Sequence, residues 1–251
     1  RELMSKIISV HSFRGGTGKS NITANLAALL AAEGRRVGVV DTDIQSPGIH
    51  VLFGLDEDKV GHALNDYLYG KCPIEDTAHD VTPPNVKGKI FLIPSSIKAG
   101  EIARVIRESY DVGLLHDGFQ KLVKALNLDA LLVDTHPGLN EETLLSIAIS
   151  DALAIIMRPD QQDFQGTSVT VEVARKLEVP RMLLIVNKAP TSLNFDDVKA
   201  QVEKTYNCEV AAILPHSDEM MTLASSGIFV LRYPNHSITN SYKQIAARLT
   251  E

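Results

Sequence analysis

The sequence is poor in cysteine and has no long apolar run. Its two cysteines in 251 residues, Cys72 and Cys208, lie far apart and match no zinc or iron–sulfur ligand spacing. We interpret both as free thiols, as is usual in a reducing cytosol. No apolar run reaches the roughly 18 residues that suggest a membrane span, and no signal-peptide pattern opens the chain. These absences together predict a cytoplasmic protein.

Positive charge is also scarce, because Lys and Arg number 25 against 31 Asp and Glu and the formal net charge is −6. This balance argues against a basic coat for nucleic acid, although a local basic patch stays possible. Hydrophobic residues make up 44 % of the chain, which is enough for a core. No repeat or linker divides the sequence, so we expect a single domain over 1–251. Met4 suggests a natural start, with residues 1–3 left from expression.

What the sequence does contain is a glycine-dense turn within residues 7–20, which read IISVHSFRGGTGKS. A β-branched apolar run precedes the turn and a helical pattern follows from Asn21, the order of a strand feeding a phosphate loop. Glycine lets backbone N–H groups surround phosphate oxygens. Lys19 adds a charge and Ser20 a hydroxyl for Mg²⁺, while the helix N-terminus adds a favourable dipole. Phe13 replaces the first glycine of the common pattern, which indicates a variant loop.

Acidic residues follow two further apolar runs. The run 37–40 ends in Asp41-Thr42-Asp43, and the run 130–133 ends in Asp134, ahead of a Pro-Gly hinge. Buried parallel strands read as continuous apolar runs, and their carboxyl ends form the ligand crevice of an open α/β sheet. Beside a phosphate loop, we favour a magnesium-linked role for these acids over solvated acids in turns.

Two polar residues near this predicted edge are harder to interpret. His136 invites a role as general base or metal ligand, but a lone histidine in a turn is more often a polar loop residue, which we favour. Asn187 follows the run 182–186 and can pair with the edge of adenine through its amide, or it can stabilise a turn. Ser217 or Asp218 is a plausible cap for a following helix.

The remaining pattern alternates strands with helices. Further strands are predicted at 90–93, 152–157 and 210–214, and helices at 61–69, 99–109, 116–126, 161–177, 219–226 and 237–249, whereas 71–89 reads as a polar surface excursion. This alternation predicts an α/β fold with one doubly wound, mostly parallel sheet flanked by helices.

The motifs RGGTGKS (14–20), DTD (41–43) and DTHPG (134–138), together with Asn187, resemble the deviant Walker A ATPases of the ParA/MinD type, which are P-loop NTPases. The resemblance spans nearly the whole chain. It implies an ATP site in which Lys19 contacts the β- and γ-phosphates, Asp43 polarises the attacking water and Asp134 supports the metal. The implied ATP-binding residues are Gly15, Gly16, Thr17, Gly18, Lys19, Ser20, Asn21, Asn187, Pro215 and Asp218, and the implied Mg²⁺ residues are Ser20, Asp43 and Asp134.

The sequence departs from that family at two positions. Position 14 is ordinarily a lysine that crosses a dimer interface to the partner's ATP, and here it is Arg14. A guanidinium can bridge two phosphate oxygens in trans, so we expect the dimer to survive and count Arg14 with Lys19 and Asp43 as catalytic. The alternative is that Arg14 faces solvent. His136 replaces the usual proline, which alters the flexibility of its loop.

The resemblance implies an ATP-dependent homodimeric switch that positions or segregates a cargo, such as a plasmid, a chromosome or, in the McdA kind, a carboxysome. A partner adaptor would stimulate slow hydrolysis. The chain ends at Glu251 without the basic amphipathic tail of MinD-like members, which favours nonspecific nucleoid DNA over a membrane. The candidate DNA-binding cations are Lys199, Lys204, Arg232 and Lys243.

Three other functions are compatible with parts of the pattern. A MinD-like membrane-associated regulator is the first alternative. A metabolic ligase or iron–sulfur carrier on the same fold is the second, but the carrier needs paired cysteines and the ligase a substrate-pocket motif that we do not find. The third is a nucleotide sensor that never hydrolyses, against which the intact Asp43 argues.

Overall fold

The computed structural model describes residues 5–251, so the residues assigned to expression and Met4 lie outside the described part. Eight strands form one sheet in the order β3-β4-β2-β5-β1-β6-β7-β8, and every pairing is parallel except β3 with β4. The predicted doubly wound, mostly parallel sheet is confirmed. The strands are β1 Lys6–His11, β2 Arg36–Asp41, β3 His79–Asp80, β4 Lys89–Ile93, β5 Ala130–Asp134, β6 Ala152–Met157, β7 Met182–Ala189 and β8 Val210–Pro215.

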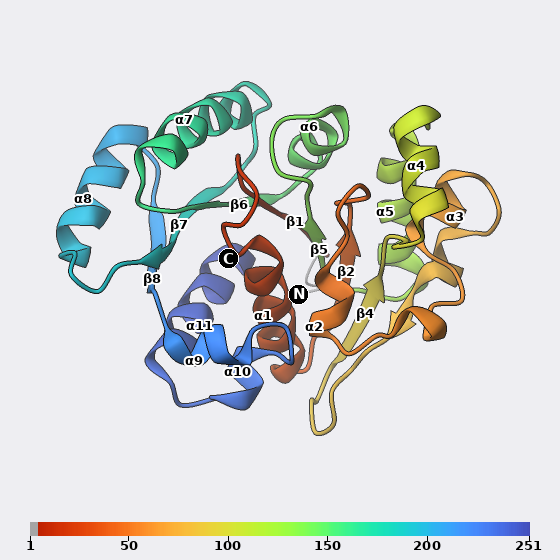
Figure 1. Cartoon of the computed structure of the whole chain (residues 1–251), viewed down its shortest axis with the longest axis horizontal. Coiled ribbons are helices and arrows are strands. Elements are labelled where there is room, and N and C mark those ends of the chain that lie inside the picture. Colours follow the sequence, from red (N-terminus) through yellow and green to blue (C-terminus); the bar gives the residue numbers. More distant parts are fainter. Residues whose placement is uncertain (1–4) are drawn as a thin grey trace.

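Helices cover both faces of the sheet (Figure 1). One face packs against α1 and α11, and the other against α3 and α5 to α8. No helix within residues 5–251 is both long and apolar enough to cross a bilayer. The helices are α1 Lys19–Ala32, α2 Ile49–Leu52, α3 Leu64–Leu68, α4 Ala99–Arg107, α5 Gly113–Ala125, α6 Glu141–Ala148, α7 Gln161–Lys176, α8 Phe195–Tyr206, α9 Asp218–Leu223, α10 Phe229–Arg232 and α11 Ser237–Thr250, with short 3₁₀ turns η1 Glu57–Lys59 and η2 Ile74–Thr77.

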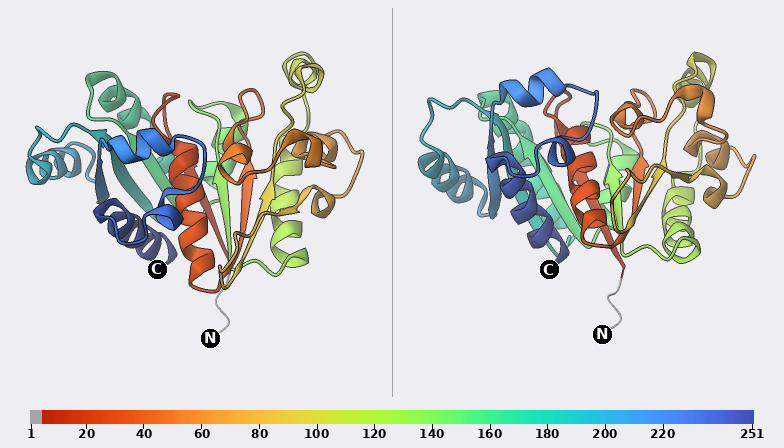
Figure 2. Two further views of the ribbon diagram at one scale, coloured as in Figure 1. Left: turned by 60° about the horizontal axis from the view of Figure 1, so that its bottom comes forward. Right: turned by 90° about the horizontal axis from the view of Figure 1, so that it is seen from below.

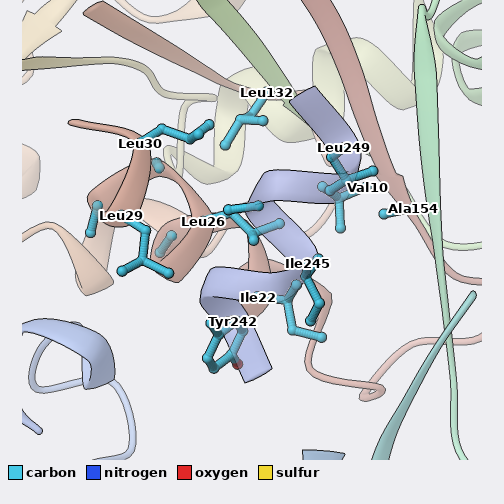
Figure 3. Close-up of a cluster of buried hydrophobic side chains, with 14 of the residues drawn as sticks. Val10, Ile22, Leu26, Leu29, Leu30, Leu132, Ala154, Tyr242, Ile245 and Leu249 are labelled. Atoms are coloured by element: carbon cyan, nitrogen blue, oxygen red, sulfur yellow. The ribbon is translucent and has the colours of Figure 1, made fainter. Parts of the chain in front are cut away.

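The helix that carries the phosphate loop is buried along most of its length. Ile22, Leu26 and Leu30 recur at helical spacing and are at most 1 % exposed. They pack with the buried stripe of α11, which includes Tyr242 and Leu249 (Figure 3). This packing fixes the start of α1 relative to the sheet, as the apolar pattern of both helices predicts.

The sequence-based description of 71–89 as a surface excursion is wrong in part. Ile74 and Thr77, both in η2, are fully buried. Ile74 lies so close to the backbone of Gly118 in α5 that a Cβ added to this glycine would stand 2.5 Å from the Cδ1 of Ile74. Within the same segment, β3 adds an antiparallel edge to the sheet. The apolar contact was hidden because a single isoleucine in a polar stretch carries no periodic signal.

The one-turn helices α2 and α10 were also missed, and so were the two longer helices α6 and α8. Both α6 and α8 begin after an asparagine whose side chain accepts backbone N–H groups, Asn140 from Thr143 and Asn194 from Asp196 and Asp197. Asparagine followed by acids in the first turn is a helix-start signal that the sequence contained.

Candidate functional site

The loops that follow β1, β2 and β5 meet at one edge of the sheet, the edge opposite to the N-terminus in Figure 2. They enclose a cavity of about 270 Å³. All seven predicted phosphate-loop residues from Gly15 to Asn21 line it together with Ser12, and Asp43, Pro137 and Lys188 complete the wall from three other segments. The strand order explains this convergence, because parallel neighbours end at the same edge.

The loop has the backbone geometry of an anion cradle. Gly16 and Gly18 have φ angles of 74° and 94°, a region that favours glycine. Gly18 is also the N-cap of α1 and supplies no side-chain cap, so the first N–H groups of the helix stay available. Thr17 adds a buried Oγ1 without a hydrogen-bond partner in the described chain. These features suit a phosphate group.

Lys19 lies in an ion pair with one of the predicted metal-site acids. Its Nζ is 2.6 Å from Oδ1 of Asp134, and the two side chains are 7 % and 1 % exposed. Asp41 is the register partner of Asp134 on the adjacent strand. Burial, followed by the charge of Asp134, raises the pKa of Asp41 to about 8. Lys19 is therefore the cation that lies beside the two buried acids Asp41 and Asp134. Asp134, although predicted to support the metal, is not among the residues that line the phosphate cavity.

The predicted Mg²⁺ residues do not form a cage by themselves. Within residues 5–251, no group of three or more His, Cys, Asp or Glu side chains is arranged to hold a metal ion. Mg²⁺ in nucleotide sites is commonly held by one or two protein oxygens together with phosphate oxygens and water. Ser20 and Asp43, which both line the cavity, could supply such oxygens beside a bound phosphate.

Asp43 has a partner that the sequence analysis did not assign to it. Its Oδ1 is 2.6 Å from Nδ1 of His136, with the side chains 14 % and 24 % exposed. The same oxygen accepts the backbone N–H of Ser46 at 3.2 Å. His136 is therefore more than a solvated loop residue, since it contacts the acid predicted to polarise water.

Arg14 is bound within its own chain. Its Nε donates to Asp163 at 2.6 Å and its Nη2 to Asp160 at 3.0 Å, and its Nη1 contacts Gln162. These three partners lie at the start of α7, where Asp160 is the N-cap. The guanidinium therefore lies mainly against these side chains of its own chain, and neither in solvent nor in the phosphate cavity. To act in trans, Arg14 would have to exchange these acids for a phosphate group bound to the partner subunit.

A second pocket, of about 380 Å³, adjoins the phosphate cavity and shares Gly18, Asn21 and Lys188 with it. Asn187 and Pro215 line it, as the adenine prediction requires. The amide nitrogen of Asn187 donates to the Thr17 carbonyl at 2.8 Å, so it also holds the loop. The remaining lining residues include Met220, Met221 and Ala224, which offer an apolar wall for a flat ring.

Asp218 is the predicted ATP residue that the structure places elsewhere. Its side chain is 97 % exposed, and it lines a neighbouring pocket of about 590 Å³. Sequence reasoning missed Lys188, whose Nζ donates to the Gly16 carbonyl at 2.8 Å and which lines all three pockets. Its position after Asn187, at the end of a buried strand, was the available signal.

The chain is similar to known proteins over nearly its whole length. The family model described as ParA, NUBPL iron-transfer P-loop NTPase, matches residues 3–250. An uncharacterised ATP-binding protein of Methanocaldococcus jannaschii is 28 % identical over 250 residues, which cover 98 % of this chain and 88 % of that protein. An iron–sulfur cluster carrier protein of Pyrococcus horikoshii is 30 % identical over 188 residues, which cover 72 % of this chain and 60 % of the carrier.

The fold is similar to that of a solved structure. The septum site-determining protein MinD of Pyrococcus horikoshii, solved as a complex with Mg-ADP, has a TM-score of 0.81 at 22 % identity and covers 98 % of this chain and 96 % of its own. At this identity the likeness shows the fold alone.

Proposed function

The chain belongs to the ParA family of P-loop NTPases, and from that premise we propose that it is an ATP hydrolase that acts as an ATP-dependent dimerising switch. The observation that carries the proposal is the convergence of the glycine cradle, Lys19 and Asp43 around one cavity beside a pocket suited to adenine. The family resemblance inferred from the motifs is confirmed at this level. The carboxysome-positioning branch stays a prediction.

In the proposed reaction, the cradle binds the phosphates and Lys19 turns from Asp134 to the β- and γ-phosphates. Bound Mg²⁺ would neutralise charge that develops on the phosphoryl oxygens. Ser20, Asp43 and Asp134 are the residues proposed to hold it, directly or through water. Asp43 orients the attacking water from the loop that follows β2. Asn187 and Pro215 face the base, and Asp218 stays a predicted contributor that would need the loop before α9 to move.

Dimerisation is proposed to depend on Arg14. In the structure its guanidinium neutralises Asp160 and Asp163 of its own chain, so a γ-phosphate presented by a second subunit would compete with these acids. A planar guanidinium suits two phosphate oxygens. ATP should therefore favour the dimer more strongly than ADP, which lacks the third phosphate.

Light scattering with ATP and with ADP tests this proposal. Wild type should double its mass with ATP under conditions that prevent turnover, and Arg14→Ala should bind ATP yet stay monomeric. Arg14→Lys should restore the dimer because it keeps the charge. Arg104→Ala, which removes an exposed cation on α4, is the matched control. A wild type that is equally monomeric with both nucleotides, or an Arg14→Ala variant that dimerises, would contradict the assignment.

The surface on which the dimer acts is also proposed, with nonspecific DNA favoured over a membrane. The four candidate cations Lys199, Lys204, Arg232 and Lys243 have no ion-pair partner in residues 5–251. Their helices lie on both faces of the sheet, however, since α8 packs with α7 and α11 packs with α1. ATP-dependent, salt-sensitive retention of random-sequence duplex is expected, and retention by anionic vesicles instead would support the MinD-like alternative.

An adaptor that stimulates hydrolysis, a cargo and a nucleoid-associated cytoplasmic location complete the proposal. They follow from the resemblance alone. Hydrolysis measured with and without the product of a neighbouring gene is the direct test, because these ATPases are commonly encoded beside their adaptors.

An iron–sulfur carrier is the second candidate function, favoured by the wording of the family model and by the Pyrococcus relative. A cluster needs several thiolates at one place. Cys72 precedes η2 near one edge of the sheet, while Cys208 precedes β8 at the other edge. Anaerobic reconstitution with iron and sulfide is therefore expected to give no stable cluster, and a cluster lost in Cys72→Ser or Cys208→Ser would favour the carrier.

A further inference from the structure

The loops after β2 and β5 are joined beyond the ends of their strands. The two strands are neighbours, with Asp41 opposite Asp134 as the last register pair. One residue on, Thr42 donates to the Asp134 carbonyl from its backbone N–H at 2.9 Å and from its hydroxyl at 3.0 Å. Two residues on, Asp43 meets His136. The contact between Asp43 and His136 therefore follows from the pairing of β2 with β5, because the two loops stay side by side beyond the ends of their strands.

The direction of the hydrogen bond is set by its partners. An ionised carboxylate can only accept, so Nδ1 of His136 carries the proton and donates to Oδ1 of Asp43 at 2.6 Å. A hydrogen bond to a charged acceptor is short and roughly twice as strong as a neutral one. The other oxygen of Asp43, Oδ2, accepts no hydrogen bond from the described part of the chain, and it is left for a water or a ligand.

His136 is itself held on both sides. Its carbonyl accepts the hydroxyl of Thr143 in α6 at 3.1 Å. Two residues later, the N–H of Gly138 donates to the carbonyl of Ser12, which lies directly before the phosphate loop, at 3.2 Å. Between them, Pro137 lines the phosphate cavity together with Asp43. The backbone that carries the imidazole is thus held on both sides, and the ring itself is held by its contact with Asp43.

We propose that His136 is a positioning residue for Asp43, whose Nδ1–H fixes one carboxylate oxygen so that the other faces the attacking water. The assignment deepens the proposed function and rests on it. A group that orients a reacting water must be held to within about 0.5 Å to be effective. His136 supplies this restraint from the loop that follows β5, so the acid is aligned only when both loops are in place.

The competing explanation is that His136 merely ties two loops together. Three substitutions separate the two explanations. His136→Asn places an amide N–H where Nδ1 stands, His136→Gln places it nearer to the position of Nε2, and His136→Ala removes the donor. A structural tie alone should show in the unfolding midpoint and in KM, whereas positioning should show in kcat and should respond to the place of the donor. His79→Ala, in the edge strand β3, is the matched control.

Single-turnover and steady-state ATP hydrolysis provide the first measurement. A positioned general base contributes about 10²–10⁴-fold, and loss of a group that orients a site residue typically costs about 10–100-fold. His136→Ala and His136→Gln should lower kcat by about 10-fold to 100-fold with KM within about twofold of wild type, and His136→Asn should recover most of the loss. In an Asp43→Ala background, His136→Ala should cost nothing further.

The second measurement needs neither nucleotide nor turnover. Long-range ¹H–¹⁵N spectra of the imidazole nitrogens in the nucleotide-free protein should show His136 protonated at Nδ1, a pattern that Asp43→Ala should change. The resonance is assigned by its absence in His136→Asn, which separates it from the other seven of the eight histidines.

The outcomes separate the two proposals. A wild type that hydrolyses ATP while His136→Ala keeps the same kcat, or gains activity, overturns the assignment alone, and so does a His136→Asn variant no better than His136→Gln. A wild type that binds ATP and never hydrolyses it overturns the proposed function and the assignment with it. A His136 ring unaffected by Asp43→Ala removes the contact on which the assignment depends.

Discussion

Lys19 is expected to stabilise the nucleotide-free protein in addition to binding phosphate. Its Nζ is 2.6 Å from Asp134, and the pair is almost fully buried beside Asp41. At an effective dielectric constant near 20, two unit charges at that separation attract by about 6 kcal/mol, most of which offsets the loss of their hydration. Removing one partner of a buried pair leaves the other charge uncompensated and costs about 3–5 kcal/mol. Lys19→Met should therefore lower the unfolding free energy by that amount.

Thermal and urea unfolding without nucleotide or Mg²⁺ measure this effect. For a chain of this size, the loss corresponds to a decrease in Tm of about 6–20 °C. Asp134→Asn combined with Lys19→Met should recover about 2 kcal/mol or more relative to Lys19→Met alone, because the unpaired charge is gone. Lys188→Met, which removes an exposed lysine bonded to the Gly16 carbonyl, should cost less than about 1 kcal/mol.

The pH dependence adds an independent check. The pKa of Asp41 is raised from 3.8 to about 8 in the folded protein, so between these values the folded state binds more protons than the unfolded state. Its contribution to the unfolding free energy therefore falls as pH rises. Without Lys19 this effect should be larger, and the deficit of Lys19→Met should be greater at pH 8 than at pH 5.5. Equal unfolding of wild type and Lys19→Met, or strictly additive single and double variants, would refute the reasoning.

Three further predictions follow from single buried or strained positions. Gly18→Ala should weaken ATP binding, measured by titration, by at least about tenfold, because a Cβ at this position would stand 2.4 Å from Nδ2 of Asn187. The control is Gly34→Ala, which should leave ATP binding unchanged, because Gly34 is also left-handed but has open space around it. Tyr242→Phe should raise Tm by about 2–4 °C, because the buried hydroxyl has no partner in residues 5–251, and a lower Tm would contradict this. Burial lowers the pKa of His11 from 6.5 to about 3, so the unfolded state takes up the proton first and the contribution of His11 to stability should fall by about 1.4 kcal/mol per pH unit below about 6.5, opposite in sign to that of Asp41. In urea titrations, the stability of His11→Asn relative to wild type should therefore be higher at pH 5 than at pH 7, and an equal difference at both pH values would exclude this origin.

Some features of the candidate site needed only the sequence. The glycines at 15, 16 and 18 with Lys19 are a local signal, since the turn, the helix start and the charge lie within a few residues. Asp41 and Asp134 were placed at one edge without any structure because each ends a continuous apolar run, and such runs are parallel strands that finish together. The doubly wound sheet followed from the same alternation, and the structure confirms it.

Other features of the site depend on the order of the strands in the sheet and on which of several charged side chains form ion pairs. Asp134, predicted to support the metal, is held by Lys19, and Arg14 contacts two acids near 160, far away in sequence. His136 meets Asp43 because β2 and β5 are neighbours in register. In each case the sequence determined which chemical groups reach the edge of the sheet. Only the tertiary structure decided which of them pair, because a buried charge takes the nearest complementary group and that proximity is set by packing, not by position along the chain.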